Sequence, residues 1–351
     1  MAKPGWEPEK IARVREALLA WYEQNRRDLP WRRSHDPYAI WVSEVMLQQT
    51  RVAVVTERYQ AFMARFPTLT ALAQAKEQEV LALWSGLGYY RRARMLHKAA
   101  QFVAGEYEGQ LPMSAEELQL LPGIGSYTAA AIASIAYGER IAVVDGNVER
   151  VICRLEGWEA VGHKNTGAAT LRKIETLAGQ LVPAEGAGDW NQAMMELGAT
   201  LCTPRNPQCL VCPVAADCST QGEHRAAPRP RMLSREIAHA LVLRDSWLAG
   251  PDNREVLLEQ RPDAATVMPG LWELPALKQS SVPPEALSMT VRHAIMQVNY
   301  YVRIRSVAEE DVASLTVAGG ERRWVALREA AGMALTGLAR KVLSRSHLLP
   351  E

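Results

Sequence analysis

Four of the five cysteines lie within one stretch of seventeen residues, and this cluster constrains the fold more than any other feature of the sequence. Their spacing is Cys202-x6-Cys209-x2-Cys212-x5-Cys218. Four thiolates this close together can close around one metal centre, either a four-cysteine zinc ion or an iron–sulfur cluster. Zinc sites usually pair their ligands at short spacings, which the six-residue gap fits poorly. The alternative is a set of buried free thiols.

Length and composition indicate a globular protein of about two domains. The chain has 351 residues, of which 48% are apolar and 23% charged, and its net charge is +1. This balance gives no global argument for nucleic acid binding, so any basic surface has to be local. No run of about eighteen apolar residues occurs, so we expect no membrane span. An odd number of cysteines without a secretion-signal pattern favours a reducing compartment.

Apolar residues recur at helical spacing through the first two-thirds of the chain, where strand-like alternation is nearly absent. Asp36-Pro37 is a good helix start because proline fits the first turn. The sequence therefore predicts a mostly α domain over residues 1–221 that includes the cysteine loop. Its helices are expected at about residues 8–25, 37 to near 48–50, 51–65, 75–84, 90–104, 114–121, 126–137, 146–156, 167–181 and 188–200.

The composition changes after the cysteines. Residues 222–235 are rich in proline and arginine and are typical of an extended, basic linker. Beyond them, period-two alternation indicates strands and therefore a smaller α+β domain over 236–351. The expected strands are 237–243, 255–260, 271–277, 297–307 and 323–327, followed by a closing helix.

A glycine-rich turn joins two of the predicted helices at Leu121-Pro122-Gly123-Ile124-Gly125. Glycine lets a backbone approach another molecule closely, and the helix that starts at Ser126 presents unpaired N–H groups. Together these groups favour an anion such as a phosphate, so the turn is a candidate for binding a nucleic acid backbone. The alternative is an ordinary αα-hairpin that only connects packed helices. An acidic residue, Asp145, follows twenty positions beyond the second glycine.

The cysteine spacing, the Leu121–Gly125 turn and the stretch Val144–Val148 together resemble the helix-hairpin-helix DNA glycosylases of the endonuclease III superfamily. Three further stretches are similar to one branch, the adenine DNA glycosylases of the MutY type. They are Trp41–Thr50, Gly86–Tyr90 and Asn191–Gly198. The resemblance covers about residues 8–220 and continues weakly beyond.

This resemblance implies a [4Fe–4S] cluster on the four cysteines and DNA phosphate binding by Leu121, Gly123, Ile124 and Gly125. It also implies a monomer that acts on double-stranded DNA containing adenine opposite 8-oxoguanine or guanine. We expect it in the bacterial cytoplasm, with the nucleoid.

Cleaving an N-glycosidic bond develops positive charge on the sugar and negative charge on the base, so two carboxylates in different protonation states are useful. Glu44 lies on an apolar helix, where burial would raise its pKa as a general acid requires. Asp145 precedes a helix, where it would stay ionised. The alternatives are a solvated glutamate and a helix N-cap. By resemblance, Glu44 protonates adenine, Asp145 stabilises the sugar cation and Asn147 supports the site.

Tyr127 bears on whether the DNA strand is cut. Bifunctional relatives carry a lysine at this place, because an amine is needed to form a Schiff base with the sugar. Tyrosine cannot form one, so the resemblance implies release of the base without strand cleavage. A core tyrosine is the alternative.

Further roles follow from the resemblance alone, with helix packing or a solvated polar face as the alternative for each. Gln49 would wedge into the duplex where the target base is extruded. The base pocket and its approaches would be lined by Arg27, Leu29, Trp31, Arg32, Leu47, Tyr89 and Gln192. Phosphate contacts are expected from Arg91, Arg92, Arg94, His97, Lys98 and Arg205.

The second domain resembles the C-terminal, Nudix-like domain of the same family through Met268–Pro275. The glutamate-rich helix that binds magnesium in active Nudix hydrolases is missing, so the resemblance implies recognition without hydrolysis. Ile295, Met296 and Gln297 stand where relatives carry a Phe-Ser-His loop that reads 8-oxoguanine. Two other functions stay open: a thymine or oxidised-pyrimidine glycosylase of the same superfamily, and a DNA-binding protein without catalysis.

Overall fold

The computed structural model describes residues 6–158, 167–224, 231–245, 254–277, 287–295, 297–315 and 320–349. The chain divides into two compact units. Unit 1 comprises Met1–Ala73 and Lys98–Pro228, and unit 2 comprises Gln74–His97 and Arg229–Glu351. None of the helices in the described part has the length and apolar character needed to cross a membrane.

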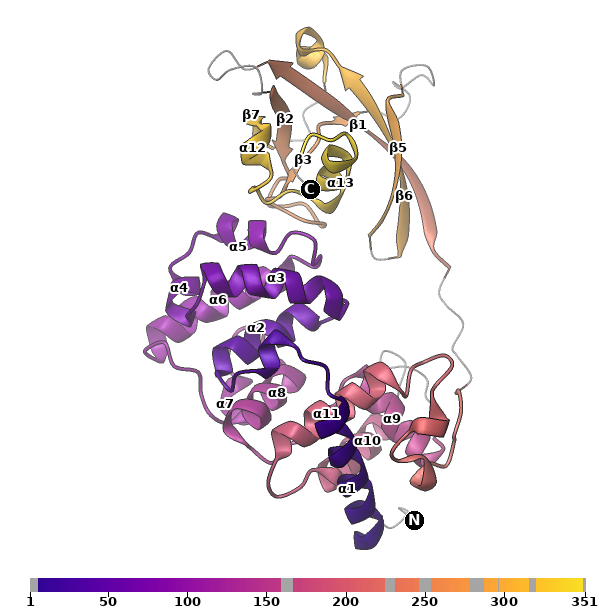
Figure 1. Cartoon of the computed structure of the whole chain (residues 1–351). Helices are drawn as coiled ribbons and strands as arrows, with labels where there is room; N and C mark the ends of the chain where they lie inside the picture. Colours follow the sequence, from indigo (N-terminus) through magenta and orange to yellow (C-terminus); the bar gives the residue numbers. More distant parts are fainter. Residues whose placement is uncertain are drawn as a thin grey trace. The chain divides into compact units, whose positions relative to one another are not determined.

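Unit 1 is built from helices throughout its described residues, which confirms the predicted mostly α fold (Figure 1). Four short elements of unit 1, of three to five residues each, were not predicted, because so few residues do not show a helical period. Helix α6 (Arg91–Glu106) belongs to both units. The other elements of unit 1 are α1 (Pro8–Asn25), η1 (Pro30–Arg32), α2 (Pro37–Leu47), α3 (Val52–Arg65), α4 (Leu69–Ala73), α7 (Ala115–Leu118), α8 (Ser126–Tyr137), α9 (Gly146–Glu156), α10 (Ala168–Leu181), α11 (Ala187–Thr200), η2 (Cys209–Val211) and η3 (Ala215–Asp217).

Helices α2 and α8 pack against each other in the interior of unit 1. Asp36 caps α2 by accepting a hydrogen bond from the Tyr38 backbone N–H at 3.0 Å, and every residue from Tyr38 to Met46 is buried. A helix that is buried on all sides needs this all-round apolar character. Helix α8 is rich in alanine, which permits the close approach. It ends at Gly138, whose φ of 73° is left-handed and suits glycine.

Helix α11 packs against α1, α8 and α9. The shared core is made of aliphatic side chains and Trp190, and it continues into α10. Helix α9 begins directly after Asp145 and ends at Gly157, which takes a left-handed φ of 67°. This packing brings the start of α9 and the last turns of α11 together, although 50 residues separate them in the sequence.

Unit 2 contains a mixed sheet with the strand order β3-β2-β1-β6-β5, so the α+β character predicted for the second part of the chain is confirmed. Strand β1 runs parallel to β6 and antiparallel to β2. Helix α13 packs its buried leucines and valine on the sheet. The elements are α5 (Glu77–Leu83), β1 (Leu233–Asp245), β2 (Arg254–Gln260), β3 (Trp272–Glu273), β4 (Ala276–Leu277), β5 (Met289–Ile295), β6 (Val298–Val307), η6 (Glu309–Ser314), β7 (Arg322–Ala326), α12 (Leu327–Ala330) and α13 (Gly337–Arg345).

Two strand predictions need correction. The strand expected at 271–277 is two short strands, β3 and β4, which pair with β2 and β1 respectively. Pro275 lies between them and has no N–H to continue a ladder. Strand β5 was not predicted, because His293 interrupts the apolar residues Met289, Val291 and Ile295 on its less exposed face.

The segment Gln74–His97 belongs to unit 2 although it interrupts the helical part of the sequence. The guanidinium of Arg94 donates to the Pro269 carbonyl at 2.6 Å, and that of Arg340 donates to the Ser85 hydroxyl at 2.7 Å. The Tyr90 hydroxyl donates to the Leu335 carbonyl at 3.0 Å. These polar contacts hold the segment to the sheet-containing part of unit 2.

Candidate active site

A cavity of about 770 Å³ lies in unit 1, between the end of α2, the start of α8, the start of α9 and the last turns of α11. It brings together residues that are far apart in the sequence. Among its lining residues are thirteen of the predicted site residues: Arg27, Leu29, Trp31, Arg32, Glu44, Leu47, Gln49, Gly123, Gly125, Tyr127, Asp145, Asn147 and Gln192.

Glu44 is buried in the wall of this cavity, with 5% of its surface exposed. The Tyr127 hydroxyl donates a hydrogen bond to its carboxylate at 2.6 Å. Burial raises the pKa of Glu44 to about 7, and the nearby charge of Asp145 adds to this, while Tyr127 and Arg32 act in the opposite direction. The solvated-glutamate alternative is therefore excluded, and about half of the carboxyl groups carry a proton at pH 7.

Tyr127 keeps its own proton. Burial, together with the charges of Glu44 and Asp145, raises the pKa of Tyr127 well above its usual value. The hydroxyl lies 2.6 Å from Glu44 and 3.5 Å from the Met195 sulfur. Tyr127 is thus a fixed hydrogen-bond donor that orients the Glu44 carboxyl group.

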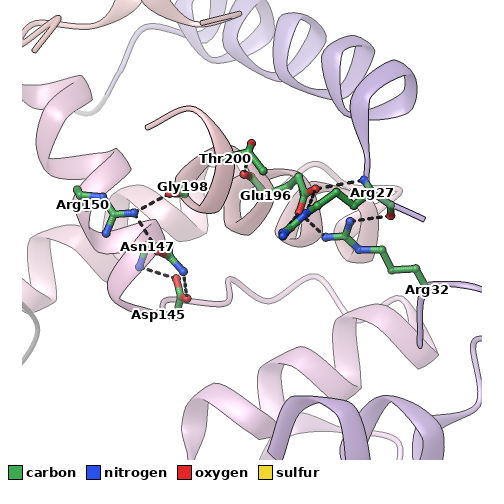
Figure 2. Close-up of polar contacts among 8 residues, drawn as sticks. All are labelled: Arg27, Arg32, Asp145, Asn147, Arg150, Glu196, Gly198 and Thr200. Atoms are coloured by element: carbon green, nitrogen blue, oxygen red, sulfur yellow. Dashed lines mark hydrogen bonds and ion pairs between the residues drawn. The ribbon is translucent and has the colours of Figure 1, made fainter. Parts of the chain in front are cut away.

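Asp145 is the N-cap of α9 and also lines the cavity. Its Oδ1 accepts hydrogen bonds from the backbone N–H groups of Asn147 at 2.9 Å and Val148 at 2.7 Å. Its Oδ2 accepts from the Asn147 side-chain amide at 2.8 Å (Figure 2). The N-cap alternative is therefore correct as a description of the local structure. The same three donors fix the carboxylate at the edge of the cavity.

Asn147 is itself held on its other side. Its Oδ1 accepts a hydrogen bond from Arg150 at 2.9 Å, and the same guanidinium nitrogen donates to the Gly198 carbonyl at 2.7 Å (Figure 2). Arg150 also donates to the Cys202 carbonyl at 2.8 Å. Arg150 had no role in the sequence analysis, because two of its partners, the Gly198 and Cys202 carbonyls, lie about fifty residues away in the sequence.

Glu196 is a second buried carboxylate of the cavity, and the sequence analysis gave it no role. Arg27 binds both of its oxygens, at 2.7 and 2.6 Å, and Arg32 adds a third contact at 2.9 Å (Figure 2). Burial acts to raise the pKa of Glu196, but the two arginines outweigh it and hold the pKa at about 2. An acidic residue among the apolar residues of α11 was the only sequence signal for it.

The glycine-rich turn presents backbone to solvent. The side chains of Leu121 and Ile124 are buried, and the Ile124 N–H donates to the Leu121 carbonyl at 3.2 Å. Gly123 takes a left-handed φ of 78°, while Gly123 and Gly125 are exposed and line the cavity. The accessible N–H groups are therefore those at the start of α8, where a helix N-terminus favours an anion.

Gln49 follows α2 in a left-handed conformation, with a φ of 58°. Its side chain is exposed at the cavity rim. A non-glycine residue in this conformation is uncommon and costs free energy, so the surrounding turn holds Gln49 in place.

Several predicted contacts lie outside this cavity. Tyr89, Ile295 and Gln297 belong to unit 2, and their proposed places against DNA stay predictions. Tyr89 is exposed with a φ of 48°, Ile295 ends β5, and Gln297 follows in an exposed turn. Met296 lies outside the described residues. Phosphate contacts also stay predictions for the basic residues Arg91, Arg92, Arg94, His97, Lys98 and Arg205.

The four clustered cysteines line one small cavity of about 30 Å³ in unit 1. Burial raises the pKa of Cys212 to about 11, and the charges of the other three thiols add to this rise. Among the described residues, no three ligating side chains are grouped closely enough to hold a single metal ion. Sulfurs on one zinc ion would lie about 4 Å apart. Because all four cysteines line one cavity, they fit a group that four thiolates hold together, such as an iron–sulfur cluster.

Comparison with protein families agrees with this geometry. Residues 42–176 match the family of HhH-GPD superfamily base excision DNA repair proteins. Residues 202–218 match the iron–sulfur binding domain of endonuclease III, so the cysteine loop is an iron–sulfur site and the predicted [4Fe–4S] cofactor is confirmed. The hairpin, the cavity and the cysteine loop thus define a helix-hairpin-helix protein of the HhH-GPD class.

Similar curated proteins indicate which branch of this class the chain resembles. The chain is 40% identical to the adenine DNA glycosylase of Mycolicibacterium smegmatis over 263 residues, covering 69% of this chain and 88% of that protein. It is 50% identical to the human adenine DNA glycosylase over 218 residues, covering 60% of this chain and 39% of that protein. A solved structure of a thermostable thymine-DNA glycosylase superposes with a TM-score of 0.55 at 30% identity, covering 61% of this chain and 97% of that one.

The chain belongs to the adenine DNA glycosylase family, as the sequence resemblance indicated. It spans 39% of the length of the human relative and 61% of the mouse and rat relatives that it also matches.

Proposed function

We propose that the chain is a monofunctional DNA glycosylase that removes adenine from mispairs with 8-oxoguanine or guanine in double-stranded DNA. One observation carries the proposal. A buried carboxyl group, Glu44, with a pKa of about 7, shares a cavity with a second carboxylate, Asp145, that three N–H donors hold in place. Two carboxyl groups with different surroundings can act as proton donor and charge stabiliser.

The reaction begins with the target adenine turned out of the duplex into the cavity. Glu44, protonated near neutral pH, gives its proton to a ring nitrogen of adenine as the bond to the sugar breaks. Tyr127 keeps the carboxyl group oriented during this step. The neutralised base is a better leaving group than an adenine anion, so the barrier falls.

The sugar then carries positive charge. Asp145 lies at the cavity edge as a fixed carboxylate and stabilises this charge, or bonds to the sugar transiently. Water completes the reaction at the sugar carbon and leaves an abasic site. Because Tyr127 stands where a Schiff base would need an amine, we propose that the DNA strand stays uncut.

DNA would bind along the face that carries the glycine-rich turn. The accessible N–H groups at the start of α8 suit a phosphate, and the exposed Gln49 at the cavity rim suits the space left by the extruded base. The opposite base would be read by unit 2, through Ile295, Met296 and Gln297, without nucleotide hydrolysis. The protein would act as a monomer on the chromosome, in the bacterial cytoplasm.

One assay tests the proposal directly. Duplexes that contain A:8-oxoG, A:G, T:G or thymine glycol are incubated with the protein, and strand breaks are counted with and without alkali. We expect alkali-dependent breaks at adenine in the first two duplexes. Breaks without alkali would contradict the role given to Tyr127, and activity on T:G alone would replace adenine by thymine as the substrate.

The second candidate is a thymine glycosylase for T:G mispairs. The structural similarity to a thymine-DNA glycosylase favours it, since the compared chains share the helical fold and 30% identity. The curated relatives of higher identity are adenine DNA glycosylases, which is why we place adenine first.

A further inference from the structure

We propose that Gly198 is a positioning residue for base release, because only glycine at this point of α11 lets Asn147 lie where it holds Asp145. The inference deepens the proposed function and rests on it. Gly198 is buried in the last turns of α11 and lines neither the active-site cavity nor the cavity at the cysteines.

Asn147 occupies the space next to the Gly198 Cα. A Cβ atom added to Gly198 would lie 2.7 Å from the Asn147 Cβ, 3.1 Å from the Asn147 carbonyl oxygen and 3.2 Å from its carbonyl carbon. Real Cβ atoms do not approach other carbons to 2.7 Å, so one of the two helices has to shift. Because two of the three atoms are backbone, rotation of the Asn147 side chain cannot relieve the contact.

A shift of Asn147 would directly displace the Asp145 carboxylate. Asn147 supplies two of the three donors to Asp145, its backbone N–H at 2.9 Å and its side-chain amide at 2.8 Å (Figure 2). The Gly198 carbonyl also holds Arg150, which binds the Asn147 oxygen. Misplacing a catalytic group by about 1 Å can cost on the order of 100-fold in rate. Gly198 therefore acts on the reaction through the position of Asn147.

Two other helix glycines provide matched controls. Gly179 in α10 has no atom within 4 Å of an added Cβ, so alanine fits there without strain. Gly188, at the other end of α11, would place a Cβ 2.8 Å from the Ile135 Cα and 2.8 Å from the Ser134 carbonyl oxygen. Ten residues, or about 15 Å of helix, separate Gly188 from Gly198. Gly188→Ala thus introduces a comparable clash in the same helix without touching Asn147.

The experiment compares Gly179→Ala, Gly188→Ala and Gly198→Ala with the wild type in single-turnover release of adenine from an A:8-oxoG duplex. Thermal unfolding, duplex affinity and active fraction are measured for each variant. We expect both tight-glycine variants to unfold at lower temperature. Only Gly198→Ala should lose base release, by roughly 10- to 100-fold per active molecule, with unchanged duplex affinity.

Equal losses in Gly188→Ala and Gly198→Ala, or no loss in the latter, would overturn the inference. Should the wild type release no adenine, the proposed function fails and the inference with it. If Gly198→Ala does not fold, the double variant Asn147→Gly/Gly198→Ala tests whether the clash with Asn147 is the cause. Asn147→Gly removes the Cβ atom that makes the closest contact. The double variant should fold; its failure where Asn147→Gly alone folds would place the clash elsewhere.

Discussion

Glu44 and Glu196 both line the cavity of unit 1, and both are buried, at 5% and 1% exposed. The partner of Glu44 is the neutral Tyr127 hydroxyl, and its pKa rises to about 7. The partners of Glu196 are two guanidinium groups, and its pKa falls to about 2. Burial alone does not decide the charge of a carboxyl group. The charge of the partners decides it, so one cavity holds a carboxyl group that titrates near pH 7 and a permanent anion.

The largest effect that we expect from replacing one of these two glutamates is on base release. Glu44→Gln keeps the shape of the side chain but removes the transferable proton. We expect adenine release from an A:8-oxoG duplex to fall by about 1,000-fold or more, with duplex binding retained. Single-turnover kinetics and a binding titration measure the two quantities. Substantial residual release would refute the role of Glu44 as proton donor.

A second effect concerns stability and pH. Because the folded pKa of Glu44, about 7, lies above its ordinary value of 4.5, the folded protein binds this proton more tightly than the unfolded chain. The resulting stability is complete below pH 4.5 and is lost as the pH rises through 7. Glu44→Gln should therefore gain about 2.5 kcal/mol relative to the wild type between pH 5 and pH 8. Denaturant unfolding at both pH values measures this gain, and a constant difference would contradict it.

Glu196→Gln provides the contrast, with a smaller effect. Two arginines lose their carboxylate partner, and because the Arg27 side chain is 37% exposed we expect a loss of about 2 kcal/mol, less than for a fully buried pair. The pKa of Glu196 is lowered to about 2, so its contribution is present above pH 4.5 and disappears only as the pH falls towards 2. The destabilisation should thus be the same at pH 5 and pH 8 in the same unfolding experiment. A strong pH dependence in this range would mean that the arginines do not hold the carboxylate as described.

The sequence predicted most of unit 1 because its helix ends carry local signals. Helices α8 and α9 begin and end as expected, since Gly125, Gly138, Asp145 and Gly157 are all caps that can be recognised in the sequence. Strand β5 carries a weaker signal, because His293 interrupts the apolar alternation of Met289, Val291 and Ile295. Strands β3 and β4 were merged into one prediction, because each has only two residues and apolar residues continue on both sides of Pro275.

The candidate site was predicted less completely. Glu44, Tyr127 and Asp145 carried a family resemblance, and the structure places all three at one cavity. Glu196 and Gly198 could not be assigned, because the importance of each depends on a distant partner. Arg27 is 169 positions from Glu196, and Asn147 is about fifty positions from Gly198. Neither spacing nor composition reports such contacts.

The most direct test of the account is the pH dependence of single-turnover adenine release by the wild-type protein. If Glu44 gives the proton, the rate is constant at low pH and falls about tenfold per pH unit above 7, where the carboxyl group has lost its proton. A rate that stays constant from pH 6 to pH 9, measured with saturating protein on an A:8-oxoG duplex, would contradict the assignment of Glu44 as the proton donor.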